Sequence, residues 1–165
     1  MGLLKKLLLG DKMEIGSKVY SPLIGEAVPL SEVNDPVFAE EMMGKGAAIK
    51  PMEGQVFAPC DGEVITVFRT LHAITIKSDS GAEMIIHVGL ETVGLNGKHF
   101  EAHVTDGSKI KKGDLLLTFD LDQIKAAGYD TITPIVITNS AEFEQVDVTG
   151  KKEVSNKDWL IRLAD

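Results

Sequence analysis

The sequence predicts an all-β protein, an antiparallel β-sandwich or barrel with one or two short helices. Many short stretches of aliphatic and β-branched residues follow one another closely, separated by Gly, Asp and Pro. This spacing favours strands joined by tight turns over alternating strands and helices. An internal repeat supports it, since residues 19–28 and 56–65 share an aromatic residue, Pro, Gly, Glu and two aliphatic residues in register. We therefore expect one strand, turn and strand unit to occur twice.

The remaining elements are expected in chain order from local signals. Helices are predicted over 36–43, capped by Asn34 or Asp35, and over 121–127, capped by Asp120 and ended by Gly128. Outside the repeat, strands are expected over 70–76, 83–89, 115–119, 133–138 and 159–163.

Length and composition indicate one domain. With 165 residues and 44% hydrophobic content, the chain can build one compact core. We expect residues 18–165 to form this domain and residues 1–17 to be an N-terminal tail. Between Leu3 and Leu8 the leucines share one helical face beside two lysines, which suits peripheral contact with a membrane surface; a frayed or locally docked tail is the alternative.

Charge and cysteine content exclude several classes. The net charge is −8 and no run of basic residues occurs, which argues against nucleic-acid binding. The single cysteine, Cys60, excludes an internal disulfide and a cysteine-based zinc site, and it fits a reducing compartment. No secretory signal and no segment long enough to span a bilayer is recognisable. A cytoplasmic location is expected.

A predicted hairpin over residues 70–89 brings two histidines together. If the turn is centred between Asp79 and Ser80, facing residues have numbers that sum to about 159, so His72 lies opposite His87. Alternation then places one set of side chains on a shared face: Phe68, Thr70, His72, Ile74, Ile85 and His87.

The two imidazoles admit three interpretations: a structural pair, two metal ligands, or a nucleophile with its helper. A purely structural pair on this apolar face would leave ring nitrogens to satisfy, at about 1–3 kcal/mol each. A hydrolytic zinc site needs a third protein ligand, and His99 and His103 are expected at the surface. A neutral imidazole attacks phosphorus at neutral pH, while a second imidazole, oriented by Thr70, can donate to the phosphoryl oxygens.

The stretch from Gly81 to Val93 resembles the active-site motif of the enzyme IIA domain, glucose type, of the bacterial phosphoenolpyruvate-dependent sugar phosphotransferase system. Supporting matches span most of the chain, at residues 35–40, 49–51, 58–62, 70–72, 119–121 and 133–134. The resemblance implies an antiparallel β-sandwich or barrel with a duplicated hybrid motif.

By this resemblance His87 is the phosphorylated residue, through Nε2, and His72 is its helper with Thr70 behind it. The donor would be the histidine phosphocarrier protein and the acceptor a cysteine on a IIB domain of a sugar permease. Partner-binding residues would be Asp35, Val37, Phe38, Phe68, Ile74, Ile85 and Glu91, the last standing where relatives often have Asp. The resemblance is compatible with permeases for glucose, N-acetylglucosamine, sucrose or β-glucosides.

No cofactor is required by the resemblance, although zinc can bind the two active-site histidines of some relatives when a partner adds a ligand. The alternative function is a zinc-dependent hydrolase of related β topology with His72 and His87 as ligands. A lipoyl or biotin carrier is excluded because no lysine lies in the required turn. Cys60 is expected to be structural.

Overall fold

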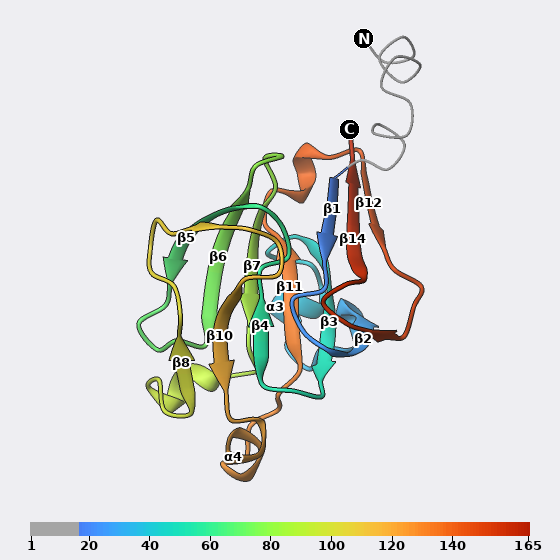
Figure 1. Ribbon diagram of the computed structural model, residues 1–165. Coiled ribbons are helices and arrows are strands. Elements are labelled where there is room, and N and C mark those ends of the chain that lie inside the picture. Colours follow the sequence, from blue (N-terminus) through green and yellow to red (C-terminus); the bar gives the residue numbers. More distant parts are fainter. Residues whose placement is uncertain (1–16) are drawn as a thin grey trace, which may run out of the picture.

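The computed structural model describes residues 17–165, which fold into three antiparallel sheets (Figure 1). The large sheet has the order β13-β2-β3-β11-β7-β6-β5-β9, and the two small sheets have the orders β1-β14-β12 and β4-β10-β8. Residues 1–16, which carry the expected tail and its membrane contact, lie outside the described residues.

The bounds of the elements are as follows. The strands are β1 (Ser17–Tyr20), β2 (Gly25–Pro29), β3 (Lys45–Pro51), β4 (Gln55–Phe57), β5 (Gly62–Val67), β6 (Ala73–Ser78), β7 (Glu83–His87), β8 (Phe100–Ala102), β9 (Lys109–Ile110), β10 (Leu115–Phe119), β11 (Thr133–Ile137), β12 (Gln145–Val148), β13 (Glu153–Val154) and β14 (Trp159–Ala164). The α-helices are α3 (Pro36–Ala39) and α4 (Leu121–Ala126), and the 3-10 helices are η1 (Leu30–Glu32), η2 (Thr92–Leu95) and η3 (Ser140–Glu142). The predicted all-β class is confirmed.

Both predicted helices form, and α3 is shorter than expected. The Asp35 carboxylate accepts from the Val37 amide at 3.0 Å, which caps α3 as predicted. The helix stops at Ala39, because Glu41 has a φ of 57° and the chain turns there. Asp120 caps α4 through the Gln123 amide at 3.1 Å. None of the helices among residues 17–165 is long and apolar enough to cross a membrane.

The internal repeat is visible in the strand order of all three sheets. The large sheet is symmetric about the β11–β7 pair, since β3, β2 and β13 on one side correspond to β6, β5 and β9 on the other. The small sheets correspond strand by strand, β1-β14-β12 to β4-β10-β8. The registers place a pseudo-twofold axis at the pair Ile135–Ile86.

Hydrogen bonds between the two repeats follow the same symmetry. The Tyr20 amide donates to the Pro59 carbonyl at 2.9 Å, and the equivalent Phe57 amide donates to the Pro22 carbonyl at 2.7 Å. These two reciprocal bonds join the turns of the two repeats. The sequence echo between residues 19–28 and 56–65 is therefore a structural duplication.

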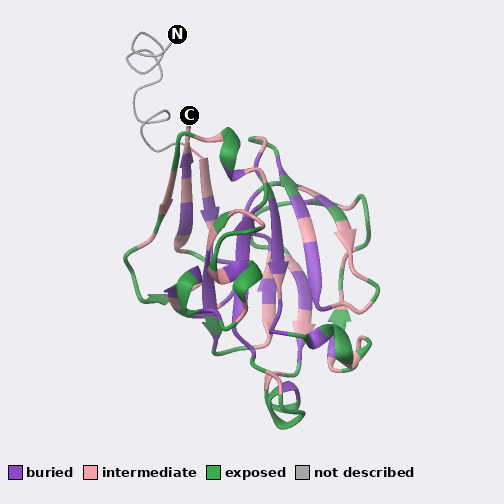
Figure 2. Ribbon diagram, turned by 180° about the vertical axis from the view of Figure 1, so that it is seen from behind, coloured by how far each residue is buried: buried purple, intermediate pink, exposed green. Residues whose placement is uncertain are grey.

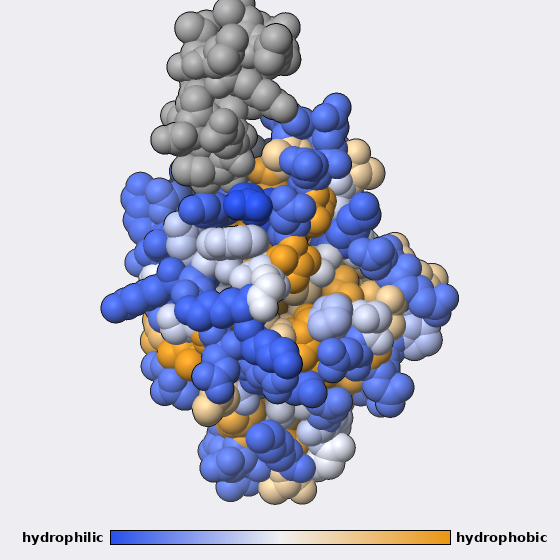
Figure 3. Space-filling view, turned by 90° about the vertical axis from the view of Figure 1, so that its right-hand side faces the viewer, coloured by the Kyte–Doolittle hydropathy of each residue, from blue (hydrophilic) through white to orange (hydrophobic). Residues whose placement is uncertain are grey.

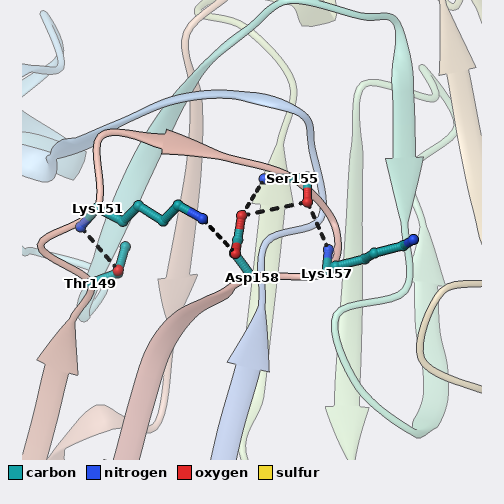
Figure 4. A network of polar contacts seen from close by, with 5 residues as sticks. All are labelled: Thr149, Lys151, Ser155, Lys157 and Asp158. Carbon is teal, nitrogen blue, oxygen red and sulfur yellow. Dashed lines mark hydrogen bonds and ion pairs between the residues drawn. The ribbon is translucent and has the colours of Figure 1, made fainter.

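The turns before β10 and β14 show the repeat in its polar contacts. In the turn before β14, Asp158 accepts from the Ser155 amide at 2.8 Å and from Lys151 Nζ at 2.9 Å (Figure 4). In the equivalent turn before β10, Asp114 accepts from the Lys111 amide at 2.8 Å.

Side chains on the face over β2, β12 and β14 are mostly hydrophilic, with apolar groups between them (Figure 3).

Apolar side chains gather on both faces of the large sheet. The main core fills the space between the large sheet and the two small ones and includes Ile74, Ile86 and Ile135, all 0% exposed. A second cluster lies on the other face, where η1 and α3 cover it with Leu30, Val33 and Phe38. Buried residues follow the strands, while α4 and most loops are exposed (Figure 2). The histidines lie beside this second cluster.

The predicted register of the hairpin is wrong by one residue. The pairs are Ala73–His87, Ile74–Ile86 and Thr75–Ile85, so facing numbers sum to 160. The turn is longer than expected, because the Ser78 amide donates to the Ala82 carbonyl and Gly81 has a φ of 99°. A one-residue slip moves every paired side chain to the opposite face relative to its predicted partner. Ile74 therefore points into the main core at 0% exposure, and its predicted place in a partner-binding surface is wrong.

Candidate active site

Three segments build the site: the end of β7 with the turn that follows it, the connection between β5 and β6, and the α3 segment. His87 is the last residue of β7. His72 immediately precedes β6, after Leu71 has turned the chain with a φ of 59°. The His72 carbonyl accepts from the Val88 amide at 2.7 Å, which joins the two segments. The imidazole centroids lie 4.8 Å apart with an interplanar angle of 85°.

His87 has a defined tautomer. Its Nδ1 lies 2.8 Å from the Gly89 carbonyl oxygen. A carbonyl only accepts hydrogen bonds, so Nδ1 carries the proton and the neutral ring keeps its lone pair on Nε2. The ring is half-buried. Nε2 of His87 is therefore the nucleophilic atom of the site.

His72 is held by the hydroxyl predicted to hold it. Thr70 Oγ1 lies 2.7 Å from His72 Nδ1, and His72 is only 3% exposed. When the hydroxyl donates to Nδ1, the proton of His72 lies on Nε2, where it can be donated to a bound anion. The structure thus brings together Thr70, His72 and His87 as the sequence predicts.

Burial keeps both imidazoles neutral. Desolvation, and to a smaller extent the neighbouring His87, lower the pKa of His72 to about 4. Desolvation also lowers the pKa of His87, while the Gly89 carbonyl and the Asp35 charge oppose this shift. A neutral His87 is the form that can attack phosphorus.

Two aromatic rings flank the pair. The Phe38 ring lies 5.2 Å from the His87 ring, and the Phe68 ring lies 5.6 Å from the His72 ring in an edge-on arrangement. Phe38 is 5% exposed and comes from α3, whereas Phe68 is half-buried and comes from the β5–β6 connection. These rings limit the access of water to the imidazoles.

The other predicted partner-binding residues have different positions. Val37 is 40% exposed on α3, and Asp35 is half-buried at its start. Ile85 is 5% exposed within the second cluster, beneath the rings. Glu91 is exposed at the start of η2 with a φ of 59°.

Sequence reasoning missed the backbone that orients His87. Gly89, Thr92 and Asp130 hold the turn after β7: Thr92 donates to the Val88 carbonyl, and the Leu90 amide donates to the Asp130 carbonyl at 2.9 Å. A glycine two residues after a strand-ending histidine was the available signal. Asp130 lies far from His87 in the sequence, and no sequence signal connects the two residues.

No group of three or more His, Cys, Asp or Glu side chains arranged to hold a metal ion occurs within residues 17–165. His103 is exposed, as predicted, with its Nε2 at 3.0 Å from Thr118 Oγ1, and His99 is half-buried. Cys60 is a buried free thiol, and burial together with Asp61 and Asp79 raises its pKa to about 12. Such a thiol is unreactive, in agreement with a structural role.

Comparisons with known proteins agree with the geometry. Residues 17–143 match the family described as phosphoenolpyruvate-dependent sugar phosphotransferase system, EIIA 1. The chain resembles the structure of glucose permease IIA from Mycoplasma capricolum with a TM-score of 0.80 and 36% identity, covering 88% of this chain and 94% of that one.

Curated relatives are larger proteins. The chain is 50% identical over 146 residues to the PTS system β-glucoside-specific EIIBCA component of Bacillus subtilis, covering 88% of this chain and 24% of that protein. It is 54% identical over 121 residues to the PTS system glucosamine-specific EIICBA component of the same organism, covering 73% of this chain and 19% of that protein. The chain therefore spans about a quarter or less of the length of these relatives.

Proposed function

Because the chain belongs to the EIIA family of the phosphoenolpyruvate-dependent sugar phosphotransferase system, we propose that it carries a phosphoryl group on Nε2 of His87 during sugar uptake. EIIA domains are phosphotransferase components, and they need no cofactor in general. The observation that carries the assignment to this atom is the contact of 2.8 Å between His87 Nδ1 and the Gly89 carbonyl, which leaves the lone pair on Nε2.

Phosphoryl acceptance follows from this arrangement. The Nε2 lone pair attacks the phosphorus of a phosphohistidine on the donor, a P–N bond forms to His87, and the P–N bond to the donor imidazole breaks. Positive charge develops on the His87 ring as the bond forms. The Gly89 carbonyl and the Asp35 carboxylate stabilise that charge.

His72 and Thr70 assist through the phosphoryl oxygens. Nε2–H of His72 donates to a phosphoryl oxygen, while the Thr70 hydroxyl holds Nδ1 at 2.7 Å. In the second transfer a cysteine thiolate attacks the phosphorus, and the His87–phosphorus bond breaks. His87 then returns to the neutral form that its burial favours.

The partners we propose are the histidine phosphocarrier protein as donor and a IIB domain as acceptor. Support for the acceptor comes from the relatives, which are named as EIIBCA and EIICBA components. Their names specify β-glucosides and glucosamine, so permeases for these sugars are the first acceptors to test. The exposed Val37 and Glu91 and the rim residue Asp35 would contact these proteins.

We further propose that residues 18–165 act as one carrier domain in the cytoplasm, with residues 1–17 as a tail that contacts the membrane surface. Zinc binding is a second use of the same imidazoles: Nε2 of His87 has its lone pair free, and so does Nε2 of His72 in the tautomer in which Nδ1 donates to Thr70. With two protein ligands from the described residues, such a site would need a further ligand from a partner. None of the comparisons supports the hydrolase alternative.

The test is phosphoryl transfer in a reconstituted system. The chain is incubated with phosphoenolpyruvate, enzyme I and the histidine phosphocarrier protein, and an acid-labile mass gain of one phosphoryl group is followed. We expect a gain in the wild type, none in His87→Ala, and a gain with poor onward transfer in His72→Gln. An undiminished gain in His87→Ala would exclude His87 as the carrier.

A further inference from the structure

Hydrogen bonds around the Gly89 carbonyl hold the turn that follows β7. The Gly89–Leu90 peptide faces His87 with its oxygen, at 2.8 Å from Nδ1, and its amide donates to the Asp130 carbonyl at 2.9 Å. The same peptide unit therefore connects the His87 ring to the segment before β11. Whatever holds this turn also determines which ring nitrogen of His87 is protonated.

Thr92 holds the turn from within. Its side chain is 0% exposed, and its hydroxyl donates to the Val88 carbonyl at 2.5 Å. Val88 in turn donates to the His72 carbonyl. The hydroxyl thus fixes the Val88–Gly89 peptide, which directly precedes the peptide whose carbonyl contacts His87.

The Thr92 methyl group also limits the turn. A Cβ atom built on Gly89 would lie 2.6 Å from Thr92 Cγ2 and 2.9 Å from the Asp130 carbonyl oxygen, and Gly89 has a φ of 78°. The Cα of Gly89 is therefore enclosed between Thr92 and Asp130, and a residue with a side chain does not fit there without displacing one of them. Asp130 is fixed in the same way, because its carboxylate accepts from the Ile132 amide at 2.9 Å.

We propose that Thr92 is a positioning residue for phosphoryl acceptance, supported by Asp130. By holding the Gly89 carbonyl on Nδ1 of His87, it keeps the lone pair on Nε2, the atom that attacks phosphorus. The effect on transfer rests on the proposed function, whereas the effect on the tautomer concerns this chain alone.

Thr92→Val tests the proposal, since valine keeps the shape and removes the hydroxyl. Nitrogen-15 NMR of histidine-labelled full chain at about pH 8, where imidazoles are neutral, reports the tautomer of His87. We expect a larger share of the Nε2-protonated form, and a rate of phosphoryl acceptance about tenfold lower. Thr92→Ser keeps the hydroxyl and should remain within about twofold of wild type in rate.

Ser21→Ala is the control. Ser21 is also buried, at 1% exposure, and its hydroxyl also donates to a backbone carbonyl, that of Leu23 at 2.6 Å, in the turn between β1 and β2. It should lose stability without a change in tautomer. If Thr92→Val does not fold, Asp130→Ala removes the carboxylate that fixes the Asp130 carbonyl and should shift the tautomer in the same direction.

The proposal is overturned if Thr92→Val, or Asp130→Ala in its place, keeps the wild-type tautomer and the rate seen in Ser21→Ala. It is also overturned if Thr92→Ser loses as much as Thr92→Val. A tautomer shift without any phosphorylation of wild-type His87 would instead support the positioning role and reject the proposed function.

Discussion

The two halves of the large sheet have the same strands and differ in the segments that connect them. In one half, β2 and β3 are joined by residues 30–44, which form η1 and α3 and cover the outer face of the sheet. In the other half, β5 and β6 are joined only by residues 68–72. Both histidines lie in or beside the half with the short connection.

Equivalent positions carry different chemistry. The pseudo-twofold axis relates His87 to Val136 and His72 to Lys45, so these residues occupy equivalent positions in the two halves. Val136 is 0% exposed in the second cluster, and Lys45 is exposed. The long connection crosses to the other half and lays Phe38 beside His87. The duplicated strands therefore supply a rigid frame, and the site arises where the duplication is broken.

The largest expected effects test the symmetric frame. Cβ atoms on Gly25 and Gly62 would each lie 2.2 Å from a strand carbonyl oxygen, of Lys50 and Lys77 respectively. Gly25→Ala and Gly62→Ala should both lower the free energy of unfolding, by about 4 kcal/mol. Urea unfolding measures it, with Gly150→Ala as control because a Cβ there meets nothing within 4 Å. Tolerance of alanine at only one of the two positions would contradict the equivalence of the repeats.

A smaller effect tests the broken symmetry. Phe38→Ala removes a ring that is 5% exposed and packs in the second cluster, so unfolding should become easier by about 3 kcal/mol. Phe68→Ala, in the short connection, removes a half-buried ring and should cost about 1 kcal/mol. Urea unfolding of the two variants compares them. Equal losses would mean that the two connections contribute alike.

The buried imidazole makes stability depend on pH. Unfolded His72 takes up a proton near pH 6.5, whereas in the folded chain its pKa is about 4, so the unfolded state binds more protons between these values. Its contribution to stability is complete above about pH 6.5 and is lost as the pH falls toward 4, on the order of 1–2 kcal/mol after discounting for solvent. His72→Gln should flatten this slope in unfolding experiments, leaving the part due to His87. A slope as steep as that of wild type would show that His72 is not the cause.

The smallest effects distinguish two helix caps. Asp35→Ala and Asp120→Ala should each cost about 1 kcal/mol, because each removes an N-cap acceptor. Asp35→Asn keeps the acceptor but removes the charge that raises the pKa of His87, so NMR titration should show a lower pKa for His87. Asp120→Asn is the control and should leave that pKa unchanged. The same shift in both variants would rule out a specific effect of Asp35.

Much of the fold and of the site could be predicted from the sequence. Local signals predict the repeat, through its Pro and Gly, and the two helix caps. The proximity of His72 and His87 follows from a hairpin of short sequence separation. The register was missed because Gly81 lengthens the turn by a positive φ, which residue types alone do not fix. His72 still reaches His87, since Leu71 turns the chain and the residue lies outside the strand.

The parts that could not be predicted depend on long-range contacts. Asp130 reaches the turn after β7 only because β11 pairs with β7. The outer face of the large sheet is covered by α3, and the position of this helix against the sheet could not be predicted because its four residues carry no periodic signal. Ile74 was placed on the wrong face for the same reason as the register, because alternation transmits a one-residue error along the whole strand.

The most direct test of the central claim is the position of the phosphoryl group on the phosphorylated chain. Phosphorus-31 and nitrogen-15 NMR distinguish the two phosphohistidine isomers and, with His87→Ala as reference, assign the residue. The hydrogen bond between His87 Nδ1 and the Gly89 carbonyl predicts phosphorylation at Nε2 of His87. A phosphoryl group on Nδ1 of His87, or on His72, His99 or His103, would contradict the account.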